Sequence, residues 1–195
     1  YHYSSSSLGD AYLSLYSELS QDSLGATNEE IVAAVKGMEK YNPYNPNWSY
    51  YLAPMVLVDR KADLAYASQL AANALPAFQR NMKGSEKYRT VGELADELDY
   101  YKAQNHELKG WILYGSGKYD DAEREMEKGK EVSPRIPSIY YHLGRVNEAQ
   151  GKLAAAEQAY AKGYGYEVSG FRRGTQNATA LKRLYEGRPP KPPTS

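Results

Sequence analysis

The chain of 195 residues has no cysteine, no net charge and only 2 phenylalanines. The absence of cysteine excludes disulfides, zinc–thiolate sites and thiol catalysis. Basic and acidic side chains balance at 24 each, so nothing indicates a polyanion-binding surface and we expect no nucleic acid partner. No apolar run approaches the roughly 18 residues that a membrane-spanning helix needs, so we expect no transmembrane segment in this chain.

Tyrosine is unusually abundant. The chain contains 20 tyrosines, and its hydrophobic content of 42% is that of a globular protein rather than a disordered one. A tyrosine side chain combines a large apolar ring with a polar tip, which suits partly wet surfaces and interfaces. The composition therefore favours a folded protein with surfaces that contact a partner.

Two consecutive stretches, residues 103–136 and 137–170, match each other at an offset of 34 residues. A period of this length with small residues at fixed places is typical of a repeated helix–turn–helix unit. Such a unit cannot bury its apolar face alone, so we expect the units to stack and to leave a continuous groove. The matched pairs are Gly110 and Gly144, Gly117 and Gly151, Ala122 and Ala156, and Lys128 and Lys162.

An earlier and less regular copy of the repeat precedes these two stretches. Residues 34–46 reproduce the spacing of residues 122–134 at an offset of 88, which is two periods plus about twenty residues. We interpret the extra residues as longer helices rather than as a separate domain.

The apolar spacing and the Gly and Pro positions predict nine helices. We expect Asn28 to cap the second helix, Pro76 to bend the fourth, and the glycines of residues 163–166 to end the eighth in left-handed conformation. The predicted ranges are 8–19, 28 to shortly before Pro43, 48–59, 62–82, 91–114, 119–132, 139–150, 153–164 and 177–185.

The repeat resembles the tetratricopeptide (TPR) family. In that family each unit has an apolar-then-small pair in its first helix, a turn glycine, a small and then a bulky residue in its second helix, and a closing proline. The corresponding residues here are Lys109-Gly110 and Leu143-Gly144, Gly117 and Gly151, Ala122 and Ala156, Met126 and Tyr160, and Pro134. Two departures are Lys109 in place of an apolar residue and Val168 in place of the closing proline.

This resemblance implies an all-α fold, a TPR-like α-α superhelix (a solenoid of helical hairpins) with a C-terminal capping helix. We expect one domain over residues 1–186, followed by a Pro-rich tail at 187–195. The expected units are residues 8–46, 47–102, 103–136 and 137–170, with the cap at 175–186.

The family also implies a concave groove lined by the first helix of each unit, where a protein or peptide partner binds. Aromatic and arginine side chains are frequent binding hot spots. The predicted groove residues are Trp48, Tyr51, Met55, Glu107, Trp111, Tyr114, Tyr141, His142 and Arg145. The alternative interpretation is that several of them only pack between helices.

Co-chaperones of this family use Lys, Arg and Asn on that wall to clamp a carboxylate terminus. The matching positions here offer Arg145 alone, so we do not expect a chaperone-tail clamp.

Motifs for chemistry are absent or incomplete. Residues 115–118, Gly-Ser-Gly-Lys, lack the first glycine and the final Ser or Thr of a phosphate loop, and they are better interpreted as an inter-helix turn. His106 and His142 occupy different repeat positions, so their side chains are not expected to converge on a metal. We therefore predict a non-enzymatic protein without catalytic residues, metal or cofactor.

Two alternative functions remain open at this stage. One is a self-assembling structural subunit of an extracellular filament or surface assembly, with Asn47 and Asn177 as glycan acceptors in Asn-x-Ser/Thr motifs. The other is the soluble TPR domain of a larger bacterial envelope protein. Because the chain begins at Tyr1 rather than Met, we expect a processed chain or a fragment. The excess of tyrosine and the two Asn-x-Ser/Thr motifs suit an extracellular subunit, so we favour an extracytoplasmic or cell-surface location over the cytoplasm.

Overall fold

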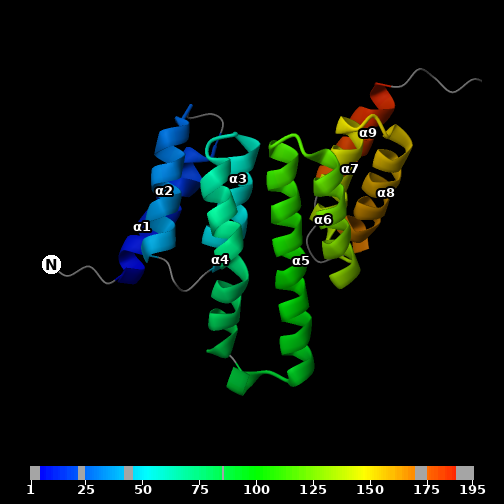
Figure 1. Cartoon of the computed structure of the whole chain (residues 1–195). Coiled ribbons are helices and arrows are strands. Elements are labelled where there is room, and N and C mark those ends of the chain that lie inside the picture. Colours follow the sequence, from blue (N-terminus) through cyan, green and yellow to red (C-terminus); the bar gives the residue numbers. More distant parts are fainter. Residues whose placement is uncertain (1–4, 22–24, 42–45, 85, 170–174, 188–195) are drawn as a thin grey trace, which may run out of the picture. The chain divides into compact units, whose positions relative to one another are not determined.

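A computed structural model describes residues 5–21, 25–41, 46–84, 86–169 and 175–187, and every regular element in these ranges is a helix (Figure 1). The predicted all-α class is therefore confirmed. The chain divides into two compact units, residues 1–132 and 133–195, and each is described by itself. The superhelix predicted over residues 1–186 stays a prediction.

The first unit begins with a hairpin of α1 (Ser5–Leu19) and α2 (Asn28–Tyr41). The predicted cap Asn28 is wrong by one residue. Thr27 caps α2 in a reciprocal box with Glu30, because its hydroxyl accepts from the Glu30 amide while the Glu30 carboxylate accepts from the Thr27 amide. The two helices approach closely where Gly37 faces the ring of Tyr12, and a Cβ at Gly37 would lie 2.1 Å from that ring.

The next pair starts with a wide helical turn, η2 (Trp48–Leu52), which continues as α3 (Ala53–Asp59). The sequence predicts one helix here but not its π-helical start. The Ala53 amide donates to the carbonyl of Trp48, five residues back, and Pro54 has no amide hydrogen for an α-helical bond. The long α4 (Leu64–Lys83) follows, capped by the Asp63 side chain, and contains Pro76 within it.

The unit ends with α5 (Val91–Gly115) and α6 (Tyr119–Val132), which follow a short helical turn, η3 (Glu86–Tyr88). The α5–α6 turn depends on Gly117, whose φ of +75° is strained for other residues. Gly110 lets the two helices meet, because a Cβ there would lie 2.5 Å from the Met126 side chain. Both glycines have the roles that the repeat pattern predicts.

The second unit consists of α7 (Pro137–Ala149), α8 (Leu153–Ser169) and α9 (Gln176–Glu186). Gly151 makes the α7–α8 turn with φ +75°, and Gly144 lies against the Tyr160 ring. The core joins α8 and α9 through Ala156, Tyr160, Ala180 and Leu184. The predicted tail at 187–195 falls almost entirely outside the described residues.

The predicted end of the eighth helix near Tyr164 is wrong. The helix continues to Ser169, and neither Gly163 nor Gly165 has positive φ. Gly163 instead allows close packing, since a Cβ there would lie 2.4 Å from the Asn177 side chain of α9. Gly163 therefore allows α8 and α9 to pack closely and does not end α8.

Candidate functional site

In the first unit, four of the predicted groove residues lie in the interface between η2–α3 and α5. The Tyr51 hydroxyl donates to Glu107 Oε2 at 2.7 Å, and the Trp111 indole donates to Asp59 Oδ1 at 2.8 Å. Glu107 is 0% exposed and Trp111 is 4% exposed, and Met55 is also buried. This burial favours the alternative in which these side chains pack between helices, because a partner could touch few of their atoms in this unit.

The two remaining predicted residues of the first unit are partly buried. Tyr114 stacks on Trp111 with ring centroids 4.3 Å apart, and Trp48 opens the π-helical turn. Tyr114 also contacts the ring of Tyr119, with centroids 5.6 Å apart, so it contributes to aromatic packing beside Trp111.

In the second unit, two of the three predicted groove residues border a pocket between α7 and α9. Tyr141 and Arg145 come from α7, and the opposite wall comes from α9 and its cap. The pocket has a volume of about 360 Å³. Its lining residues are Tyr141, Arg145, Thr175, Gln176, Thr179, Ala180 and Arg183.

Two arginines from different helices converge on one carboxylate at this pocket. Arg183 Nη2 donates to Glu148 Oε2 at 2.5 Å, and Arg145 Nε lies 3.8 Å from the same oxygen. The hydrogen bond to Glu148 raises the pKa of Arg183, so this guanidinium remains charged. Two positive charges thus face one negative charge, which leaves the group with a formal excess of one positive charge.

Neighbouring hydroxyl groups hold this arrangement in place. Arg145 Nη1 donates to the Tyr141 hydroxyl at 3.0 Å, and the Tyr160 hydroxyl donates to Glu148 Oε2 at 2.8 Å. Burial, followed by the bond to Glu148, raises the pKa of Tyr160, so its hydroxyl stays protonated as a donor. The third predicted residue, His142, is buried beside this wall, with its ring edge-on to Tyr141 at 5.2 Å.

The sequence reasoning missed the α9 side of the pocket because it assigned that helix only a capping role. Thr175, Thr179 and Arg183 are spaced four residues apart, which puts their side chains on one helix face. That spacing was the available signal. The adjacent face of α9 carries the buried Ala180 and Leu184, and Ala180 also reaches the pocket lining, so the polar rim borders directly on the apolar core.

The structure places the two predicted glycan acceptors differently. Asn177 is 0% exposed, and its Nδ2 donates to the carbonyl of Pro137 at 3.0 Å and to Glu167 Oε1 at 2.9 Å. A glycan on this nitrogen is incompatible with that packing. Asn47 is partly buried and directly precedes η2.

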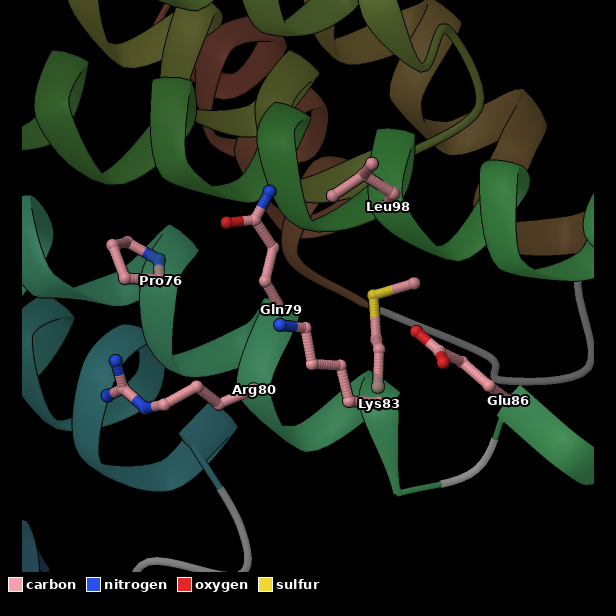
Figure 2. A pocket seen from close by; sticks show the side chains of 7 residues that line it. Pro76, Gln79, Arg80, Lys83, Glu86 and Leu98 are labelled. Carbon is pink, nitrogen blue, oxygen red and sulfur yellow. The ribbon is translucent and has the colours of Figure 1, made fainter.

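A second pocket lies in the first unit, between the end of α4 and the start of α5 (Figure 2). It has a volume of about 510 Å³. Figure 2 shows Leu98 of α5 facing Pro76, Gln79 and Lys83 of α4. The full lining is Pro76, Gln79, Arg80, Met82, Lys83, Glu86 and Leu98, which combines apolar groups with two cations and one carboxylate.

Within the described ranges, no group of three or more His, Asp and Glu side chains is placed to hold a metal ion. The helices of these ranges also include none that is long and apolar enough to cross a membrane. Comparisons of the chain with protein-family models, with curated proteins and with solved structures gave no match.

Proposed function

We propose that this chain is a non-enzymatic, TPR-like protein-binding scaffold, and that the pocket between α7 and α9 holds an acidic group of its protein partner. The observation that carries the proposal is the convergence of Arg145 and Arg183, from two different helices, beside Tyr141 at one open pocket.

The repeat geometry supports the scaffold part of this proposal. Gly110 and Gly144, which are 34 residues apart, each lie against a bulky residue of the following helix, Met126 and Tyr160. Gly117 and Gly151 adopt the same left-handed φ of +75° in the two turns. Glycines at equivalent repeat positions thus have the same structural roles in consecutive hairpins, as expected for a repeat protein.

The chemistry of the pocket supports an acidic ligand. A guanidinium group carries five N–H donors in a planar fork that matches a carboxylate. The side chains of Arg145 and Arg183 are 36% and 58% exposed, so both can be reached from solvent while they contact Glu148. The Thr175 and Thr179 hydroxyls and the Gln176 amide add neutral polar groups around the rim.

The test compares two neighbouring cations of α9. The probe is a fluorescein-labelled acidic peptide, with a twin in which Gln and Asn replace Glu and Asp. We expect Arg183→Ala to raise the Kd for the acidic peptide about tenfold to hundredfold, the loss expected for a charged hydrogen bond. Lys182→Ala is the matched control, because Lys182 pairs with Glu186 and does not line the pocket.

Fluorescence anisotropy at low and high salt measures both affinities, and circular dichroism checks that the variants stay helical. Arg145→Gln and Tyr141→Phe should also weaken binding, with the smaller effect from the loss of one hydroxyl. Equal affinity of the wild-type chain for the acidic peptide and its neutral twin would refute an acidic ligand. Unchanged affinity in both arginine variants would remove the pocket from the binding site.

A further inference from the structure

The pocket between α7 and α9 has a carboxylate, that of Glu148, in contact with both of its arginines. Arg183 Nη2 donates to Glu148 Oε2 at 2.5 Å, and Arg145 Nε lies 3.8 Å from the same oxygen. Glu148 does not line the pocket, and its side chain is 17% exposed, against 36% for Arg145 and 58% for Arg183. The carboxylate is therefore less accessible than the two cations that a ligand meets first.

The core of the second unit fixes the position of Glu148. The Tyr160 hydroxyl donates to Glu148 Oε2 at 2.8 Å, and Tyr160 itself is 0% exposed. The Tyr160 ring lies against Gly144 of α7 and belongs to the same buried cluster as Ala180 of α9. Moving the carboxylate away would break its bond to this buried hydroxyl. The negative charge of Glu148 therefore stays beside the pocket when a ligand enters.

The three charged groups act on one another. The hydrogen bond to Glu148 raises the pKa of Arg183, and the positive charge of Arg145 opposes that rise. Two cations and one anion give a formal charge of one positive unit. A ligand with one negative charge neutralises this group, whereas a ligand with two leaves one uncompensated negative charge beside a partly buried carboxylate. Such a charge is unfavourable because protein surrounds it in place of water.

We infer that Glu148 determines which acids this pocket accepts: it selects a group with one negative charge, a carboxylate, over a group with two, such as a phosphate monoester. The inference rests on the proposed function, because it concerns the acidic group that Arg145 and Arg183 bind. The arginines attract every anion, and Glu148 repels an anion in proportion to its charge. A dianion is thus repelled about twice as strongly as a carboxylate in the same place.

The test uses two peptides that differ at one residue. Both are blocked at their ends and otherwise uncharged; one carries a single glutamate, and the other carries phosphoserine, whose charge is about −2 above neutral pH. Nuclear magnetic resonance titration of the isotope-labelled full chain measures even weak Kd values, and the amide signals of Thr175, Gln176 and Thr179 show whether the peptide lies at the pocket. A third peptide, whose only acid is a free C-terminal carboxylate, distinguishes a terminal from a side-chain source of the single charge.

The wild-type chain should bind the glutamate peptide more tightly than the phosphoserine peptide. Glu148→Gln removes the negative charge but keeps an oxygen that can accept from Tyr160 and Arg183. We expect this variant to lower the Kd about threefold for the glutamate peptide and about tenfold for the phosphoserine peptide, because the repulsion that is removed is twice as large for a dianion. The preference should therefore shift about threefold toward phosphoserine.

Glu157→Gln is the matched control. Glu157 of α8 accepts from the Tyr185 hydroxyl of α9 at 2.5 Å and does not line the pocket, so this variant also loses the carboxylate of a tyrosine–glutamate bond between helices. It should leave the preference unchanged, and circular dichroism checks that both variants stay helical.

Three results would overturn the role of Glu148 while the acidic pocket stands. They are weaker binding of both peptides by the Glu148→Gln chain, an equal change of both Kd values, and a wild-type chain that prefers phosphoserine. Binding of neither peptide at the pocket would instead refute the proposed function, and the role of Glu148 with it.

Discussion

At the scale of single residues, glycine decides where helices touch in this protein. A Cβ at Gly144 would lie 2.2 Å from the Tyr160 ring, and one at Gly110 would lie 2.5 Å from Met126. Gly165 of α8 differs, because a Cβ there would have no heavy atom within 4 Å. The repeat pattern identifies the first two as contact positions, and the structure supplies the bulky groups that require them.

The residue-scale prediction uses this difference. Gly144→Ala should lower the free energy of unfolding by about 1–3 kcal/mol, because the Tyr160 ring must shift within a packed core. Gly165→Ala should raise it by about 0.5–1 kcal/mol, because alanine restricts the unfolded chain and fits an exposed helix interior. Urea unfolding followed by circular dichroism measures both. Equal effects of the two substitutions would contradict the close-contact role of Gly144.

At the scale of elements, caps and turns determine where the helices begin. Thr90 and Glu93 form a capping box at the start of the 25-residue α5: the Thr90 hydroxyl accepts from the Glu93 amide, and the Glu93 carboxylate accepts from the Thr90 amide. These bonds to Thr90 lower the pKa of Glu93, so the carboxylate that completes the box is ionised at neutral pH.

For this element we expect Thr90→Ala to destabilise the start of α5 by about 1 kcal/mol, because the Glu93 amide loses its acceptor, the Thr90 hydroxyl. Thr90→Ser keeps the hydroxyl and should retain most of the stability. Hydrogen exchange of the amides in the first turn of α5, together with thermal unfolding, measures the effect. If the serine variant exchanges as fast as the alanine variant, the hydroxyl is not the stabilising group.

At the scale of the whole molecule, the abundant tyrosines act as donors to glutamate carboxylates. In the first unit, Tyr51 donates to Glu107, Tyr66 to Glu39 and Tyr101 to Glu97. In the second unit, Tyr160 donates to Glu148 and Tyr185 to Glu157. The high tyrosine content thus has a structural use that the composition alone does not reveal, since four of these five bonds join residues more than ten positions apart in sequence.

The buried tyrosine hydroxyls should make the fold sensitive to alkali. Burial, followed by the bond to Glu97, raises the pKa of Tyr101 to about 12, and burial raises the pKa values of Tyr16, Tyr66 and Tyr160 further. In the unfolded chain these hydroxyls ionise near pH 10. Because the folded pKa values are the higher ones, their stabilisation is complete below pH 10 and is lost as the pH rises above it.

We therefore expect helical circular dichroism to fall as the pH rises from about 10 toward 12, together with a late rise in tyrosinate absorbance. Tyr101→Phe is the control, because it removes one hydroxyl that must ionise on unfolding and should reduce the pH dependence of stability. Complete ionisation of all tyrosines near pH 10 with unchanged helix content would contradict this prediction.

Much of the local structure could be predicted from the sequence, and the errors have identifiable causes. The range of α6 is as predicted, and α3, α5, α7 and α9 differ from their predicted ranges at the ends or in the first turns. The continuation of α8 past Tyr164 was missed, because a glycine such as Gly163 often follows the end of a helix. In this protein Gly163 lies within α8 and allows close contact with Asn177. Tertiary packing here outweighed local preference.

The amino-acid sequence by itself determined the helical class and the places of the hairpin turns, because periodic apolar residues and turn glycines act over a few positions. The tertiary structure decided which aromatic and charged side chains are accessible. Tyr51 and Trp111 became buried when η2 and α3 packed on α5, whereas Tyr141 and Arg145 came to face Arg183 of α9. Whether a side chain is exposed depends on contacts between residues that are far apart along the chain. The spacing of residues within one helix does not show which distant residues will lie close in space.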